Sequence, residues 1–248
     1  MYQMYAPLKY CQLKIGDAEL KYDGRRFHLF HQNRFWMGYD TLTGWQSSEF
    51  IIELNHAKGV CVTTGLGLGI LQTLLLKSGK IEKVVVYEKN QDIIDLFLAM
   101  VEFNKFDITK LVIINQDAGN IKDTKSECLF IDHFESDPYE KIISSVKFIA
   151  ANNQTNFLWY WPASFHFLEF CEAKQIPCTM ESYALWKLQN NLEFLPSNLD
   201  EDDFNSLLNL KQKYLEDTAG RFNKRLNQLK KRNTMIEMFE NNKRANYV

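Results

Sequence analysis

The chain lacks long apolar segments and the marks of an export signal. Nowhere among its 248 residues does an uncharged apolar run approach the roughly 20 residues that a bilayer-spanning helix requires. The start, Met1 to Tyr10, has neither the basic beginning nor the apolar stretch of a signal peptide. We therefore expect a cytoplasmic protein without a membrane partner.

The chain also lacks the cysteine pattern of a disulfide framework or a zinc site. Its five cysteines are odd in number and scattered: Cys11, Cys61, Cys128, Cys171 and Cys178. No pair has the CxxC spacing, and no histidine and cysteine cluster has the spacing of a zinc site. We predict reduced thiols and no metal.

The chain also has almost no excess of charge of one sign, because 29 basic and 31 acidic side chains give a formal net charge of -2. This excludes a uniform field that would draw the whole protein onto nucleic acid. A local basic stretch near the C-terminus is formed by Arg221, Lys224, Arg225, Lys230, Lys231 and Arg232. A helix with these residues could contact phosphates, but such a face is more often solvated, or pairs with acids of its own or a neighbouring chain, here those around Asp200. Nucleic acid is the less favoured partner, and a homo-oligomer stays open.

The first 45 residues have the pattern of short strands. Strand-like segments are separated by Gly16-Asp17 and Asp23-Gly24, and Asp-Gly between such segments is a strong hairpin signal. Residues 33–45 are expected to form a loop. We predict a small N-terminal antiparallel β meander over residues 1–45.

Residues 46–180 begin with a helix and then alternate apolar strands with helices, which is typical of crossover units and a parallel sheet. Strands are expected at Val60–Thr64, Lys83–Glu88, Leu111–Asn115, Leu129–Asp132 and Asn156–Trp161. Residues 181–248 are expected to form a charged helical extension. The predicted fold class is α/β: a Rossmann-like, mostly parallel sheet with the N-terminal β meander and a helical C-terminal extension.

A glycine loop, Gly65-Leu66-Gly67-Leu68-Gly69, stands directly between the first of these strands and a helix start. Glycines suit places where the backbone turns sharply and a ligand lies against the main chain, and the helix beyond offers unpaired N–H groups. The dinucleotide pattern G-x-G-x-x-G fails, because Ile70 or Gln72 stands at its third glycine. The Gly-Lys-Ser/Thr ending of a Walker loop is also missing.

The remaining pattern, G-x-G-x-G after the first strand of a parallel sheet, resembles motif I of the class I AdoMet-dependent methyltransferases. The resemblance implies that the three loop glycines lie against S-adenosylmethionine (AdoMet). It implies that Glu88, which ends the next strand, accepts hydrogen bonds from both ribose hydroxyls. It also implies that Asp117 meets the adenine amino group and that Asp132 lies beside the sulfonium. These acids follow successive strands, at the edge where open α/β sheets bind ligands.

Within this superfamily the chain is similar to the spermidine synthase-like branch over roughly residues 8–165. The branch motif Gly-Gly-Gly-Asp-Gly corresponds to Gly65–Gly69, with Leu68 in place of the acid. Its motif Asp-Ser-Ser-Asp-Pro corresponds to Asp132–Pro138. In this chain the Asp137-Pro138 pair stands two residues later than the Asp-Pro pair of the motif. The missing acid removes repulsion toward the methionine carboxylate, so we favour AdoMet over its decarboxylated form.

The same comparison provides candidates for the acceptor side. Asp132, His133 and Asp137 are candidates to orient or deprotonate the nucleophile. Glu49 corresponds to a pocket acid of the branch, and with Asp137 it is a candidate substrate contact. For Glu49 a solvated helix position is an equally open interpretation.

We therefore expect a methyltransferase that uses AdoMet, with a small molecule as the favoured acceptor and a protein as a further option. Because methyl transfer depends mainly on aligning a nucleophile with the methyl group, proximity would supply much of the rate. An aminopropyltransferase using decarboxylated AdoMet is the first alternative. A catalytically silent protein that keeps the fold as an interaction scaffold is the second.

Overall fold

The structure is a computed structural model that describes residues 12–40, 49–134 and 137–213. Backbone packing divides the chain into two compact units, Met1–Ser206 and Leu207–Val248. Every contact described below lies within the first unit, which contains two sheets and the helices around the larger one. The expected division at residue 180 stays a prediction.

The N-terminal region forms a four-stranded antiparallel sheet in the order β1-β2-β3-β4. Its strands are β1 (Gln12–Ile15), β2 (Ala18–Tyr22), β3 (Arg26–His31) and β4 (Arg34–Asp40). The expected loop over 33–45 was wrong in its first part, where β4 lies. Gln32 and Asn33 both have positive φ, which fits the tight two-residue turns that join hairpin strands. That turn returns the chain along β3.

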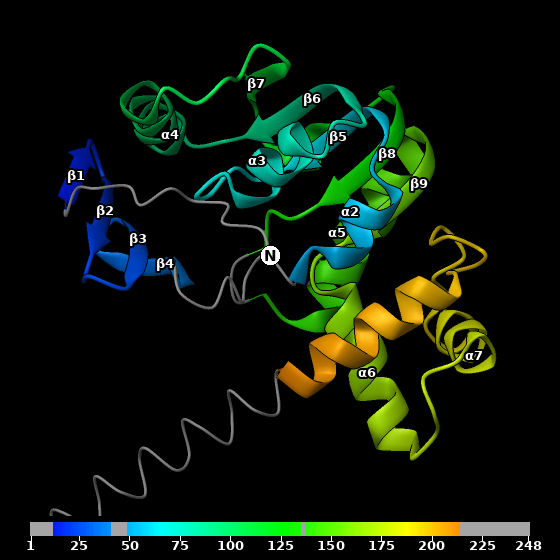
Figure 1. Cartoon of the computed structure of the whole chain (residues 1–248). Coiled ribbons are helices and arrows are strands. Elements are labelled where there is room, and N and C mark those ends of the chain that lie inside the picture. Colours follow the sequence, from blue (N-terminus) through cyan, green and yellow to red (C-terminus); the bar gives the residue numbers. More distant parts are fainter. Residues whose placement is uncertain (1–11, 41–48, 135–136, 214–248) are drawn as a thin grey trace, which may run out of the picture. The chain divides into compact units, whose positions relative to one another are not determined.

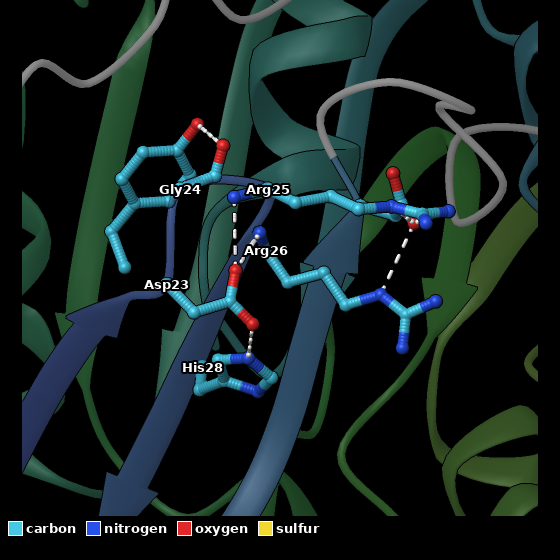
Figure 2. Close-up of polar contacts among 7 residues, drawn as sticks. Asp23, Gly24, Arg25, Arg26 and His28 are labelled. Atoms are coloured by element: carbon cyan, nitrogen blue, oxygen red, sulfur yellow. Dashed lines mark hydrogen bonds and ion pairs between the residues drawn. The ribbon is translucent and has the colours of Figure 1, made fainter.

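Figure 2 shows how the connection from β2 to β3 is held. One oxygen of Asp23 accepts hydrogen bonds from the backbone N–H groups of Arg25 (2.9 Å) and Arg26 (2.7 Å), and the other pairs with His28 (3.1 Å). These bonds hold the pKa of Asp23 far below its usual value. The side chains of Arg25 and Arg26 both pair with Asp40, which is buried at the end of β4. These ion pairs fix the turn between β2 and β3 to β4, the strand at one edge of this sheet.

The second sheet is parallel and has five strands in the order β7-β6-β5-β8-β9 (Figure 1). The strands are β5 (Gly59–Thr64), β6 (Ile81–Glu88), β7 (Leu111–Asn115), β8 (Lys125–Ile131) and β9 (Gln154–Tyr160). All four pairings are parallel. The predicted fold class is confirmed.

Helices connect and cover these strands. They are α2 (Ile51–His56), α3 (Ile70–Lys77), α4 (Gln91–Asn104), α5 (Tyr139–Asn152), α6 (Ala163–Lys174) and α7 (Met180–Asn190), with a short 3₁₀ helix η1 (Ala118–Asn120). The helix α3 contacts β6, α4 contacts β6 and β7, and α2 and α5 contact β9. From β5 the chain adds β6 and β7 on one side and then β8 and β9 on the other. A crevice therefore opens between the carboxyl ends of β5 and β8, where such sheets bind ligands.

A buried carboxylate ties α2 to the segment that begins at Asp200. Asp203 is fully buried and accepts hydrogen bonds from His56 Nε2 (2.6 Å) and Asn55 Nδ2 (2.9 Å). The ring of His56 also stacks on Phe157 of β9, with centroids 4.1 Å apart. These contacts fix the position of α2. Glu49, whose side chain belongs to the candidate site, comes just before this helix.

Candidate functional site

One cavity of about 910 Å³ lies at the carboxyl ends of the parallel strands. Every strand of the sheet contributes residues that follow its last position: Gly65–Gly67 after β5, Lys89 and Asn90 after β6, Asp117 and Ala118 after β7, Asp132–Phe134 after β8, and Trp161 after β9. The turn and strand around Trp36 of the N-terminal sheet, Glu49 and Phe50 before α2, and residues 70–72 of α3 also line the cavity. The predicted edge of the sheet is therefore the edge that carries the cavity.

The glycine loop turns sharply because all three glycines adopt positive φ, at 75°, 50° and 69°. A Cβ on Gly65 would lie 1.9 Å from the backbone oxygen of Asp132, so the loop packs directly on the end of β8. Gly65 and Gly67 line the cavity, as the sequence predicts. Gly69 does not line it, and a Cβ there would meet the ring of Phe97 at 2.1 Å. Gly69 thus serves the packing of α3 against α4.

Glu88 ends β6 and points toward the glycine loop. One carboxylate oxygen accepts from the N–H of Leu66 (2.9 Å) and the other from the N–H of Asn90 (2.8 Å). The side chain lies at the cavity wall and is 8% exposed. Each oxygen has a second lone pair, so the carboxylate can accept further bonds from a ligand.

Asp117 also lines the cavity, after β7. One of its oxygens accepts from the N–H of Gly119 (2.8 Å) and caps η1, and the side chain is exposed. Glu88 and Asp117 therefore lie on the β6 and β7 side of the loop.

A side chain from the N-terminal sheet lies against the loop, which the sequence did not indicate. Met37 of β4 accepts a hydrogen bond from the N–H of Leu68 at 3.3 Å. A Cβ on Gly67 would lie 2.6 Å from the sulfur of Met37. The N–H of Gly67 itself donates to no atom of the described residues. The loop thus keeps one open donor beside a flexible thioether.

The end of β8 joins Asp132 and His133 through Thr64. The hydroxyl of Thr64 accepts from the N–H of Asp132 (2.8 Å) and bonds the Nδ1 of His133 (2.8 Å), whose Nε2 bonds Ser145 (3.2 Å). Burial lowers the pKa of His133 to about 4, so the ring is neutral near pH 7. The two ring nitrogens of His133 thus contact the hydroxyl groups of Thr64 and Ser145.

Asp132 lines the cavity, and the residue as a whole is half-buried. Burial raises its pKa to about 7, far above that of a solvated aspartate. A carboxyl group that titrates near neutral pH can accept a proton from a ligand. The predicted role of Asp132 stays a prediction.

The two candidate substrate contacts lie in different places. Glu49 lines the cavity and accepts a hydrogen bond from the indole N–H of Trp161 at 3.1 Å. Asp137 forms an ion pair with Lys141 one helical turn along α5 and does not line the cavity. The structure brings Glu49 together with Asp132 and leaves Asp137 apart.

Gln72 of α3 is a cavity residue that the sequence did not single out. Its side chain is buried and donates to the hydroxyl of Thr63 and to the carbonyl of Gly65, both at 2.9 Å. An amide on an otherwise apolar face of the helix after a glycine loop is the signal that could have indicated it.

One group of side chains bears on the expectation of no metal. Asp17, His31 and Asp92 place ligand atoms within 4.8 Å of one another, between the N-terminal sheet and α4. Asp92 accepts from the N–H of Asp17 (2.8 Å), and His31 contacts the amide of Asn90 (2.6 Å). These contacts join the small sheet to the start of α4.

Two expectations about partners concern other parts of the chain. The basic stretch from Arg221 to Arg232 lies outside the described residues. No helix within the described ranges is both long and apolar enough to cross a membrane.

Solved structures provide the comparisons for this fold. No family model matches the chain, and no curated protein matches its sequence. The chain is similar to an S-adenosylmethionine-dependent methyltransferase from Clostridium acetobutylicum ATCC 824, with 16% identity, a TM-score of 0.35 and coverage of 47% of this chain and 49% of that one. It is also similar to the spermidine synthase from Thermotoga maritima, with 13% identity, a TM-score of 0.36 and coverage of 50% and 61%.

A third similar structure is a spermidine synthase in complex with the transition state analogue AdoDATO, with 12% identity, a TM-score of 0.40 and coverage of 59% and 52%. The chain thus matches between 49% and 61% of these three proteins' own length. The similarity concerns fold alone.

Proposed function

We propose that this protein binds AdoMet in the cavity at the sheet edge and transfers its methyl group to a small-molecule acceptor. One observation carries the proposal: Gly65 and Gly67 line the cavity after β5, and the carboxylate of Glu88, one strand over, is hydrogen-bonded to the same loop. A glycine loop beside an acid is suited to an adenosine whose ribose lies over β5 and β6.

The groups around the loop fit the polar parts of such a ligand. The N–H of Gly67 is an open donor, and Glu88 retains lone pairs for two vicinal hydroxyls. Asp117 lies one strand further and would accept from an exocyclic amine. Met37 has to shift its flexible side chain where the ligand approaches Gly67.

AdoMet supplies an electrophilic methyl carbon on a positively charged sulfur. With Glu88 and Asp117 holding the adenosine, Asp132 and Trp161, which line the cavity after β8 and β9, would be left for the reactive end. Asp132, with a pKa of about 7, is suited to take a proton from the acceptor near neutral pH. His133 is neutral and positions this strand end through Thr64.

Transfer of an aminopropyl group from decarboxylated AdoMet is the second candidate. The observation that favours it is the charge of the lining, in which the acids Glu49, Glu88, Asp117 and Asp132 outnumber the bases Arg34 and Lys89. Such a lining suits a ligand that has lost its own carboxylate. Tighter binding of decarboxylated AdoMet than of AdoMet would favour this candidate over methyl transfer.

Calorimetry with S-adenosylhomocysteine tests the proposal, and Asp117→Asn and Glu88→Gln locate the binding. We expect wild-type binding, a loss of a few-fold for Asp117→Asn, and a loss of about 10- to 100-fold for Glu88→Gln, because an amide replaces an acceptor of hydroxyl hydrogen bonds. Thermal unfolding checks that each variant is folded. Absence of wild-type binding at millimolar ligand would refute the proposal.

A further inference from the structure

Asp17, His31 and Asp92 form a group of metal-ligating side chains that no part of the proposed function uses. Each offers one ligand atom, and the three atoms lie within 4.8 Å of one another. The residues come from three different elements. Asp17 lies in the turn between β1 and β2, His31 ends β3, and Asp92 lies in the first turn of α4.

The backbone of the small sheet brings these three residues together. In the pairing of β2 with β3, Ala18 lies opposite His31, which places Asp17, the residue before Ala18, beside the imidazole. The N–H of Asp17 donates to Oδ2 of Asp92 at 2.8 Å. A Cβ on Gly16 would collide with the carboxyl group of Asp92, so the glycine allows α4 to approach the turn. The group is therefore held by main-chain contacts.

The hydrogen bonds of Asn90 show that the ring of His31 is neutral. Asn90 is the N-cap of α4, and its Oδ1 accepts from the N–H of Asp92 at 3.0 Å. Its Nδ2 therefore faces Nε2 of His31, at 2.6 Å. An amide nitrogen can only donate, so Nε2 of His31 has to accept with its lone pair. A neutral imidazole is the form that binds metal ions.

The charge of this group also favours a cation. Asp17 and Asp92 are two carboxylates at short distance, and the neutral ring of His31 adds no positive charge. Within the described part of the chain, no ion pair includes either carboxylate. A bound cation would offset the repulsion between them.

The donor set selects the kind of cation. Mg²⁺ and Ca²⁺ prefer oxygen ligands alone, whereas Zn²⁺ accepts imidazole nitrogen together with carboxylate oxygen. Tetrahedral Zn²⁺ with bonds of about 2.0–2.2 Å places its ligand atoms about 3.4 Å apart. Small rotations of the side chains, of which that of Asp17 is exposed, bring the present atoms to this spacing.

We propose that Asp17, His31 and Asp92 bind one Zn²⁺ ion, with water at its fourth position, and that the ion connects the small sheet to α4. The ligands are distant in sequence, and 75 residues separate Asp17 from Asp92. Because the unfolded chain does not hold them together, zinc binding stabilises the folded state. The distance in sequence is also why no zinc motif is visible in the sequence.

Calorimetry with zinc chloride tests the proposal on the full chain, prepared without a histidine tag and with its cysteines reduced. We expect one Zn²⁺ per chain and no binding of Mg²⁺ at millimolar concentration. Zinc at about 100-fold excess over its dissociation constant should raise the midpoint of thermal unfolding by about 5–10 °C.

Two variants locate the ion. Asp17→Asn changes an exposed side chain, and His31→Gln keeps an acceptor for the amide of Asn90, so both should fold. We expect each to weaken zinc binding about 100-fold, because removing a ligand costs at least as much as removing a hydrogen bond that supports one. Neither should keep the zinc-dependent rise in the unfolding midpoint. His28→Gln is the matched control, a half-buried histidine on the same strand that pairs with Asp23, and it should bind zinc as wild type does.

Each contrary result has a definite meaning. Absence of zinc binding by wild-type protein at about 100 µM overturns the proposal. Wild-type affinity in both Asp17→Asn and His31→Gln also overturns it, because the ion would then lie elsewhere, for example on cysteines. If Mg²⁺ binds as tightly as Zn²⁺ and His31→Gln has no effect, the carboxylates hold a hard cation and the assignment to zinc is wrong. The titrations contain no S-adenosylhomocysteine, so their result does not depend on the proposed function.

Discussion

Gly65 and Gly79 share a left-handed backbone conformation but differ in what surrounds their missing side chain. Their φ values are 75° and 73°. A Cβ on Gly65 would lie 1.9 Å from the backbone oxygen of Asp132, whereas a Cβ on Gly79 would meet no atom within 4 Å. Alanine at either position carries the same conformational penalty, and alanine at Gly65 adds a collision with the main chain.

The size of the two effects follows from this difference. A left-handed conformation costs an ordinary residue about 1–2 kcal/mol, which is the expected loss in free energy of unfolding for Gly79→Ala. At Gly65 the end of β8 has to move, and forcing extra volume into a packed site adds about 1–3 kcal/mol. We therefore expect Gly65→Ala to lose about 2–5 kcal/mol, since the shift also strains the bond from Asp132 N–H to the hydroxyl of Thr64.

Urea unfolding followed by fluorescence of the five tryptophans measures both losses. Calorimetry with S-adenosylhomocysteine on the folded variants then separates stability from binding, and we expect loss of affinity for Gly65→Ala alone. Equal losses of stability in the two variants would show that the Asp132 carbonyl does not approach Gly65, and the close contact between β5 and β8 would be refuted.

Three further perturbations have defined outcomes. Between pH 7 and pH 8 the free energy of unfolding should fall by about 1 kcal/mol, because the folded pKa of Glu53, about 8, lies above its unfolded value and the folded state binds the extra proton. In urea titrations at both pH values Glu53→Gln should remove most of this decline, and the rest comes from Asp132, whose raised pKa of about 7 acts in the same direction. Asp203→Asn should lose about 1–3 kcal/mol in the same assay, because it removes the charge that His56 and Asn55 share, whereas exposed Asp202→Asn should lose almost nothing. Gly67→Ala collides with a flexible side chain, so in a double-mutant cycle Met37→Ala should recover part of its loss; additive losses would contradict the contact.

The parallel sheet was predictable because its signals are local. Short apolar segments between helices predict the strands of such a sheet, and the segment Leu111–Asn115 forms β7 with the predicted bounds. The chain order of strands also fixes which ends meet, so the positions of Glu88, Asp117 and Asp132 along one edge followed from the alternation of strands and helices.

The N-terminal sheet and α6 were less predictable because their stability comes from distant partners. The strand β4 contains Trp36 and Gly38, a composition that is typical of a loop. It forms a strand because β3 pairs with it along its length and because Asp40 forms ion pairs with Arg25 and Arg26 at the turn between β2 and β3. The helix α6 was not predicted, because its aromatic residues do not follow one face. Phe167 is fully buried against Tyr183 and Trp186 of α7, a contact that the sequence alone does not show.

Burial of Glu53 was also beyond the sequence, since an acid in the first turn of a helix is ordinarily solvated and favoured there by the helix dipole. Its depth depends on β9 and on the segment around Asp203, which enclose α2 from different parts of the chain. The same holds for Met37, whose contact with the loop depends on where the small sheet docks.

Some departures from local rules lie at the cavity wall or one helical turn from a residue that lines it. Positive φ at Gly65 and Gly67 and an unsatisfied carboxyl oxygen at Glu53 each raise the free energy of the folded state. A stable fold does not require any of them, because an apolar residue of similar volume at position 53 would fill the same space without an orphaned oxygen. Such departures are expected where a structure is shaped for a ligand rather than for stability. The two glycines shape the wall of the cavity beside Glu88, and burial keeps Glu53 largely protonated near pH 7.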